Sequence, residues 1–207
     1  HPIPRRQRQM CIRDSAQLVR EAQRQGVHVL PVCINRSDSE ADLERHEDEI
    51  ALRLGFNQIS GLAVTDYEAL VAARRLGGPF DSVADCAKRA GLGPGALERL
   101  ARADAFAGLG LSRRQALWAV RALAPESRAA ALPLFAHRGL DVLPPEDEHA
   151  AALPALTPGM EVLEDYASLR LSLKAHPMAF LREDMHARNV RPLQALDTAG
   201  NGRRIGV

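Results

Sequence analysis

Two stretches of the sequence decide the fold: ALRLGFNQISGLAVTDYEALVAARR (51–75) and ALERLARADAFAGLGLSRRQALWAVRAL (96–123). Each is predicted to form a helix, a short glycine-containing turn and a second helix. The turns comprise, in the first stretch, Ser60, Gly61, Leu62 and Ala63, and in the second, Gly108, Leu109 and Gly110. Two such units lie close enough in the chain to pair, which is the layout of a tandem helix-hairpin-helix.

Glycine-containing turns that open a helix are suited to binding anions, because the first N–H groups of a helix lack intrahelical partners and carry its positive end. On nucleic acid the anion is a backbone phosphate, which is contacted without reading base sequence. We therefore predict DNA contacts from the two turns and from the start of the last helix: Ser60, Gly61, Leu62, Ala63, Gly108, Leu109, Gly110, Ser112, Arg113 and Arg114. The alternative is that the turns only connect helices and that the arginines are solvated.

Composition and charge narrow the class of protein. The 207 residues carry a net charge of +1, with 46% hydrophobic and 26% charged residues, as in an ordinary globular protein. Bases outnumber acids between residues 61 and 121, whereas acids dominate between 123 and 165, so nucleic acid should prefer the hairpin region. No apolar run approaches the roughly 20 residues of a membrane helix, and we expect a cytoplasmic protein without a membrane partner.

No constellation of catalytic or metal-ligating residues stands out in the sequence. The three cysteines, Cys11, Cys33 and Cys86, are far apart and have no partners at the spacing of a metal site. We predict no catalytic residue and no metal ligand within this chain.

Regular structure is predicted along most of the chain. Residues 1–15 include MCIRDS, which we interpret as translated from a sequencing-library adaptor and exclude; the alternative is a basic disordered arm. A short helix over Ser15–Gln25 and a strand over Val27–Ile34 precede a polar surface loop over Asn35–Glu49. Further helices are predicted at 48–59, 64–76, 81–90, 94–104, 112–123 and 162–173.

Residues 124–160 contain six prolines and no sustained periodicity, which predicts a linker. The sequence ends in GNGRRIGV (200–207), which reads as a turn followed by the beginning of a strand. We expect this strand to belong to a truncated domain.

Five segments in this order carry a resemblance to a known family: PVCINRSD (31–38), IALRLGFNQISGL (50–62), GPFDSVADCAKRAGL (78–92), ALERLARADAFAGLGLSRRQALWAV (96–120) and EDYASLRLSLKAHPMAFLR (164–182). They resemble the bacterial C-family DNA polymerases, of the polymerase III alpha-subunit type. The last segment, with SLKAHPM, favours the error-prone branch that works in damage-induced (SOS) mutagenesis and translesion synthesis.

The resemblance implies a mostly α-helical C-terminal fragment. Its parts would be the end of the fingers region (16–47), the tandem helix-hairpin-helix that holds the template-primer duplex (48–123), the Pro-rich linker (124–160), and a helix with the truncated start of an OB-fold (161–207). The full-length protein would be a DNA-directed DNA polymerase, a nucleotidyltransferase. Its Mg²⁺ ions would be held by acidic residues of a palm domain upstream, so this chain alone should be inactive and without a cofactor of its own.

The match departs from the family pattern at the first turn. Ser60 stands where the family commonly has a basic residue, and Ala63 replaces the second hairpin glycine. Alanine can donate its N–H but tolerates positive φ poorly. We therefore expect the second hairpin to be the better phosphate contact.

A short apolar peptide follows the hairpins within the linker. Its Leu132, Leu134 and Phe135 are similar to the clamp-binding peptide of replicative relatives, which implies a sliding clamp or other mutagenesis proteins as partners. The alternative is that these side chains fold back onto the nearest helix. The rival interpretation of the whole chain is a non-catalytic helical interaction module that docks a partner such as a sliding clamp.

Overall fold

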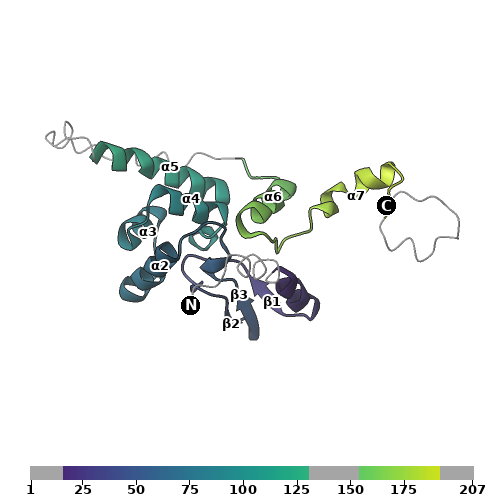
Figure 1. Ribbon diagram of the computed structural model, residues 1–207, viewed down its shortest axis with the longest axis horizontal. Helices are drawn as coiled ribbons and strands as arrows, with labels where there is room; N and C mark the ends of the chain where they lie inside the picture. Colours follow the sequence, from purple (N-terminus) through teal and green to yellow (C-terminus); the bar gives the residue numbers. More distant parts are fainter. Residues whose placement is uncertain (1–15, 131–153, 192–207) are drawn as a thin grey trace, which may run out of the picture.

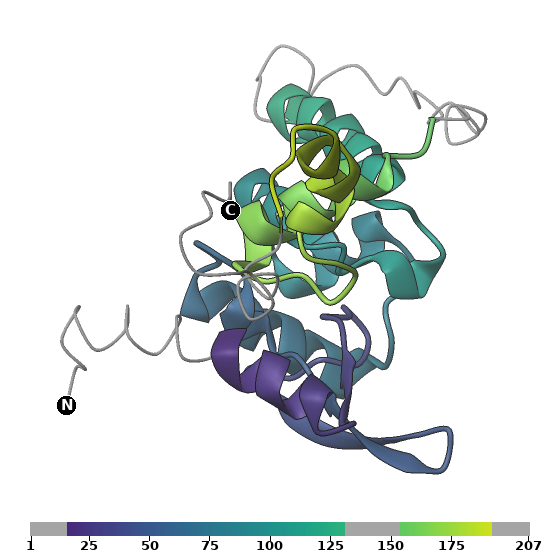
Figure 2. The same ribbon diagram turned by 90° about the vertical axis from the view of Figure 1, so that its right-hand side faces the viewer.

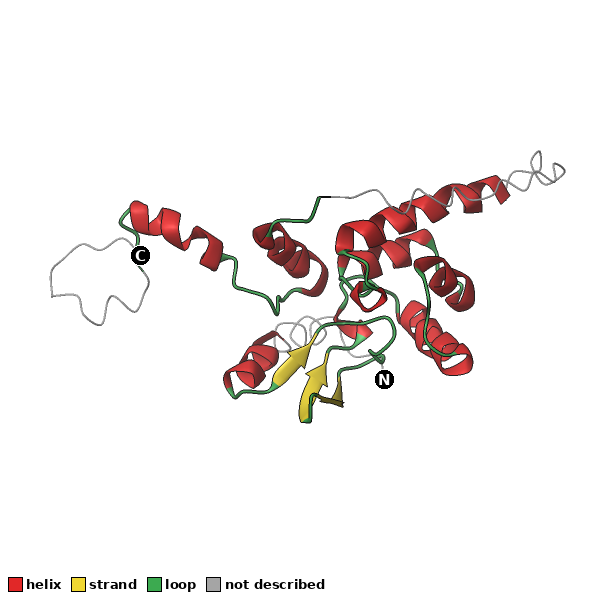
Figure 3. Ribbon diagram, turned by 180° about the vertical axis from the view of Figure 1, so that it is seen from behind, coloured by secondary structure: helices red, strands yellow, loops and turns green. Residues whose placement is uncertain are grey.

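The computed structural model describes residues 16–130 and 154–191, and it is mostly helical with a small sheet on one side (Figures 1 and 3). A helix over residues 16–24 leads into the sheet, as the sequence predicts. In the part of the chain described, no helix combines the length and the apolar character needed to span a membrane.

The sheet has three strands, β1 (His28–Leu30), β2 (Asp42–His46) and β3 (Glu49–Arg53), in the spatial order β1-β3-β2. β3 is parallel to β1 and antiparallel to β2. β2 and β3 form a hairpin that projects from the body of the molecule (Figure 2). Its two-residue turn places Glu47 and Asp48 at φ values of 48° and 69°, the left-handed geometry that matches the twist of paired strands.

Two predictions for this region are wrong. The segment over Asn35–Glu49 is not all loop, because it contains β2, and the helix predicted at 48–59 is replaced by β3 and the 3₁₀-helix η1 (Phe56–Gln58). β3 contains Ala, Leu and Arg, which favour helices, but β1 and β2 flank it on both edges, so that pairing overrides local preference. The predicted strand Val27–Ile34 is confirmed only over His28–Leu30.

Three helices follow close to their predicted positions: α2 (Val64–Gly77), α3 (Val83–Ala90) and α4 (Pro94–Arg102). α5 (Arg113–Ala130) starts as predicted but does not end at residue 123, so its last turns lie in the segment predicted to be a linker. The helix ends carry recognisable signals. Ser82 caps α3 by accepting the Asp85 N–H, and Gly91 ends it in the left-handed conformation at φ 63°. A second 3₁₀-helix, η2 (Ala107–Leu109), lies between α4 and α5.

Two helices lie beyond the undescribed residues 131–153: α6 (Pro158–Leu169) and α7 (Met178–Ala187). The helix predicted over 162–173 begins earlier, because Thr157 caps it by accepting the Met160 N–H, and ends at Arg170 with φ 63°. α7 is missed by the sequence analysis. This helix starts directly after Pro177.

One hydrophobic core joins the sheet region, the hairpin helices and the end of α6. Phe56, Phe80 and Phe106 are fully buried in it, and Leu169 and Leu171 reach the same core from the C-terminal side. The Ile34 N–H donates to the Ala105 carbonyl at 2.8 Å, which links the segment after β1 to the turn before α5. The predicted domain boundaries stay predictions, and the start of an OB-fold over 200–207 lies outside the described residues.

Candidate nucleic-acid interface

The first turn, Ser60 to Ala63, connects η1 to α2. Its left-handed residue is Gly61, at φ 74°, whereas Ala63 has φ −75° and ψ 150°, an extended conformation that alanine adopts without strain. Ala63 therefore does not need the positive φ that alanine tolerates poorly, and this reason for ranking the second hairpin above the first is removed. That the second hairpin is the better phosphate contact stays a prediction. The demanding backbone position is occupied by the glycine that is present.

The start of α2 is open. Its N-cap residue, Ala63, has no oxygen in its side chain and forms no side-chain cap. Of the backbone N–H groups here, Ser60 donates to the Ser168 carbonyl at 2.7 Å and Leu62 to the Ile59 carbonyl at 3.3 Å. Within the described residues, no acceptor is recorded for the N–H groups of the other positions up to the first helical turn: Gly61, Ala63, Val64 and Thr65.

The second turn is more self-contained. Gly110 adopts φ 75°, and the N–H groups of Leu109 and Gly110 are used inside the turn, on the Phe106 and Ala107 carbonyls at 2.9 and 3.0 Å. Ser112 and Gln115 cap α5 reciprocally: the Ser112 N–H donates to Gln115 Oε1 at 2.9 Å, and the Gln115 N–H to Ser112 Oγ at 3.4 Å. The N–H groups without a recorded acceptor among the described residues are as many here as at the first turn: Gly108, Leu111, Arg113 and Arg114. The two sites differ because side chains cap the start of α5, whereas no side chain caps the start of α2.

Close packing requires a glycine at position 108. An added Cβ would lie 2.7 Å from Cys33 Sγ, so a larger residue would push the turn off the segment that follows β1. The glycine therefore holds η2 against the sheet region.

Arg113 is not available to DNA in this structure. Its side chain is 3% exposed and forms a hydrogen-bonded ion pair with Asp165 of α6, and its Nη1 donates to the Glu161 carbonyl at 3.0 Å. The prediction that Arg113 contacts phosphate is therefore corrected: the side chain faces α6 instead of solvent. Arg114 is half-buried and donates to the Pro154 carbonyl at 2.7 Å.

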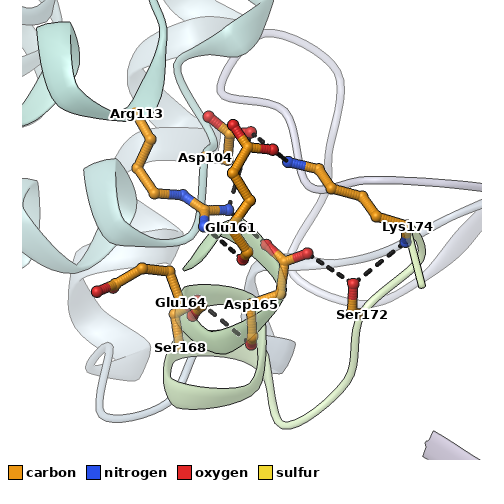
Figure 4. A network of polar contacts seen from close by, with 8 residues as sticks. All are labelled: Asp104, Arg113, Glu161, Glu164, Asp165, Ser168, Ser172 and Lys174. Atoms are coloured by element: carbon orange, nitrogen blue, oxygen red, sulfur yellow. Dashed lines mark hydrogen bonds and ion pairs between the residues drawn. The ribbon is translucent and has the colours of Figure 1, made fainter. Parts of the chain in front are cut away.

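The Arg113–Asp165 pair is the centre of a polar network between α5 and α6 (Figure 4). Ser172 Oγ donates to Asp165 Oδ2 at 2.8 Å, and Lys174 pairs with Glu161 and lies 3.7 Å from Asp104 Oδ2. Arg113 Nε is buried without a partner among the described residues. Arg113 Nη2 also lies 3.8 Å from Asp104 Oδ2, so the network fixes α6 against the hairpin helices.

A pocket that the sequence does not predict lies beside the first turn. Its open volume is about 510 Å³, and its wall is formed by residues of the turn, α4 and the end of α6, among them Ser60, Gly61, Glu98, Arg99, Glu164 and Arg170. Arg99 and Arg170 are remote in sequence from the turn, so local pattern alone gives no reason to group them with it.

The helix-hairpin-helix class is also found by comparison with known families: a family described as helix-hairpin-helix motif matches residues 26–116. Among similar proteins, error-prone DNA polymerase 1 of Rhizobium meliloti (strain 1021) is 44% identical over 211 residues, covering 93% of this chain and 18% of the relative. Error-prone DNA polymerase 2 of Agrobacterium fabrum is 46% identical over 196 residues, covering 92% and 18%. The error-prone DNA polymerase of Ruegeria pomeroyi is 48% identical over 170 residues, covering 81% and 15%.

The chain is therefore homologous to one segment of the error-prone DNA polymerases, and this segment carries a helix-hairpin-helix motif. It spans 18% of the length of the first two of these curated relatives. The apolar peptide with Leu132, Leu134 and Phe135 lies outside the described residues, and its binding to a clamp stays a prediction.

Proposed function

We propose that this chain binds duplex DNA without sequence preference, as part of an error-prone DNA polymerase. The observation that carries the proposal is the open start of α2, where a left-handed glycine leads into an uncapped helix with several N–H groups that have no acceptor among the described residues. A phosphate oxygen would satisfy these donors and interact favourably with the helix dipole.

The proposal extends to the role of the whole protein. A full-length relative of this kind would synthesise DNA past damaged template, with Mg²⁺ held by acidic residues outside this chain. The present segment would hold the template-primer duplex behind the active site. Because such binding neutralises phosphates, counterions are released and the affinity falls steeply as salt rises.

A backbone substitution tests the carrying observation without removing any charge. Val64 is the first residue of α2, so Val64→Pro deletes one N–H at a helical position that accepts proline, and the extended Ala63 suits the residue before a proline. Val64→Ala is the matched control, because it trims the same exposed side chain and keeps the N–H. The measurement is fluorescence anisotropy of the chain with labelled duplex DNA across a salt series.

We expect the wild-type chain and Val64→Ala to bind with the same salt dependence, and Val64→Pro to bind roughly tenfold more weakly, which corresponds to one lost charge-assisted hydrogen bond. Equal affinity of the two variants would show that the start of α2 does not contact phosphate. Absence of binding by the wild-type chain at about 50 mM salt would contradict the proposed function and favour the interaction module instead.

A further inference from the structure

The pocket beside the first turn has features that the two hairpin turns alone do not supply. It lies where the turn before α2, the α4 helix and the C-terminal end of α6 meet, and it holds three arginines, Arg99, Arg102 and Arg170, and two glutamates, Glu98 and Glu164.

Two of the five charges cancel locally. Arg102 Nη2 lies 2.9 Å from Glu98 Oε1, an i,i+4 pair along α4. In the described residues, Arg99 and Arg170 form no ion pair or side-chain hydrogen bond, and the carboxylate of Glu164 forms none either. The remaining side chains therefore leave the pocket with two uncompensated cations against one carboxylate.

Arg99 lies directly against the turn. A Cβ added to Gly61 would be 2.5 Å from Arg99 Nη1, so the guanidinium occupies the space that a side chain at this position would need. Gly61 thus meets two requirements, a left-handed backbone and room for a cation beside the turn. An exposed arginine that crowds a turn with free N–H donors offers an anion both hydrogen bonds and charge.

Arg170 reaches the same pocket from the other side. It ends α6 in the left-handed conformation, at φ 63°, and its position follows from how α6 docks on the turn. The Ser60 N–H donates to the Ser168 carbonyl at 2.7 Å, and Gln58 Nε2 donates to the Leu169 carbonyl at 2.8 Å. These bonds also occupy carbonyls at the negative end of α6, which reduces its repulsion of an anion.

We propose that this pocket binds one backbone phosphate of the DNA strand that the first turn contacts, with Arg99 as the main cation and Arg170 as the second. The inference rests on the proposed function and adds α4 and α6 side chains to the interface. α6 lies outside the residues 26–116 that match the helix-hairpin-helix family, so Arg170 extends the contact beyond that motif.

The test uses Arg99→Gln and Arg170→Gln, which remove the charge and keep a polar side chain that can donate hydrogen bonds. Arg182→Gln on α7 is the control, because it removes another exposed arginine, which does not line the pocket. Binding of each chain to labelled duplex DNA is followed by anisotropy across a salt series. We expect Arg99→Gln to weaken binding roughly tenfold, with a smaller loss for Arg170→Gln. Arg99→Gln should also reduce the slope of log affinity against log salt concentration by about one.

A double substitution distinguishes one shared phosphate from two separate ones. If Arg99 and the start of α2 hold the same group, Arg99→Gln combined with Val64→Pro should weaken binding by less than the product of the single effects. Additive losses would overturn the shared site. Unchanged melting of each variant by circular dichroism, expected for exposed side chains, shows that loss of binding is not loss of fold.

The failure of this inference differs from the failure of the proposed function. If Arg99→Gln and Arg170→Gln both bind like Arg182→Gln while Val64→Pro is weakened, the pocket is not a phosphate site but the hairpin still binds DNA. If the wild-type chain shows no salt-dependent binding to duplex DNA, both proposals are overturned.

Discussion

The absence of a side chain at Gly61 matters both for the backbone conformation of the turn and for the position of Arg99. Its φ of 74° costs a non-glycine residue about 1–2 kcal/mol, and a methyl group would also displace Arg99. We expect Gly61→Ala to lower the melting temperature and to weaken DNA binding, because the guanidinium moves away from the turn. Thermal unfolding and anisotropy measure the two effects.

Gly95 provides the matched control at the residue scale. It lines the same pocket in the first turn of α4, and a Cβ there would meet nothing within 4 Å. Gly95→Ala should leave stability unchanged or raise it by up to about 1 kcal/mol, since alanine favours the helix. Equal destabilisation by the two substitutions would contradict the role assigned to Gly61.

Among the elements, the sheet contains a buried arginine that joins two strands and the segment after β1. Arg53 of β3 is buried and donates to Glu44 of β2 through Nε at 2.7 Å, and its Nη1 donates to the Pro31 carbonyl at 2.8 Å, so it also ties the segment after β1. The hydrogen bond from Arg53 holds the pKa of Glu44 below its usual value of 4.5.

This pKa shift predicts how the pair's contribution depends on pH. The folded pKa of Glu44 lies below the unfolded one, so its contribution to stability is fully present above about pH 4.5 and is lost as pH falls through the folded pKa. We expect Glu44→Gln to melt at a lower temperature than wild type at neutral pH, with the difference vanishing in acid. Glu183→Gln, on the exposed face of α7, should show no such pH-dependent difference.

On the scale of the whole molecule, the Arg113–Asp165 pair joins the hairpins to the part of the chain beyond residues 131–153. Asp165→Ala removes the hydrogen-bonded carboxylate of a buried guanidinium, which then keeps only Asp104 Oδ2 at 3.8 Å from Nη2. We expect a loss of about 3 kcal/mol in the free energy of unfolding, measured by urea denaturation. Glu98→Ala breaks the exposed Arg102 pair and should cost less than about 1 kcal/mol. Similar losses in both variants would show that the buried pair does not anchor α6.

The sequence predicts α2, α3 and α4 well because the signals that mark a helix lie within the helix and at its ends. α2, α3 and α4 have apolar periodicity with a capping serine, glycine or proline at their ends. β3 is mistaken for a helix because its residues favour one, and only its pairing with β1 and β2 makes it a strand. Pairing of segments more than twenty residues apart, as between β1 and β3, cannot be read from a local window.

The candidate site is only partly predictable for the same reason. The two turns can be located from their glycines. Which arginine near them remains available to phosphate depends on which one is buried in the folded protein. Arg113 stands at the start of a helix, as a phosphate contact would, yet it is buried under α6, whereas Arg99 lies beside Gly61 although 38 residues separate them. Neither fact follows from spacing along the chain.

The buried pair also has a consequence for how the chain matures during translation. Asp165 is synthesised 52 residues after Arg113, so the guanidinium leaves the ribosome long before its partner exists. Until then, the surface that α6 later covers stays hydrated, and the hairpin helices lack Leu169 and Leu171 from their core. Completion of this core is therefore delayed until the residues up to about Lys174 have emerged, and the nascent hairpins spend that interval open to chaperones and proteases.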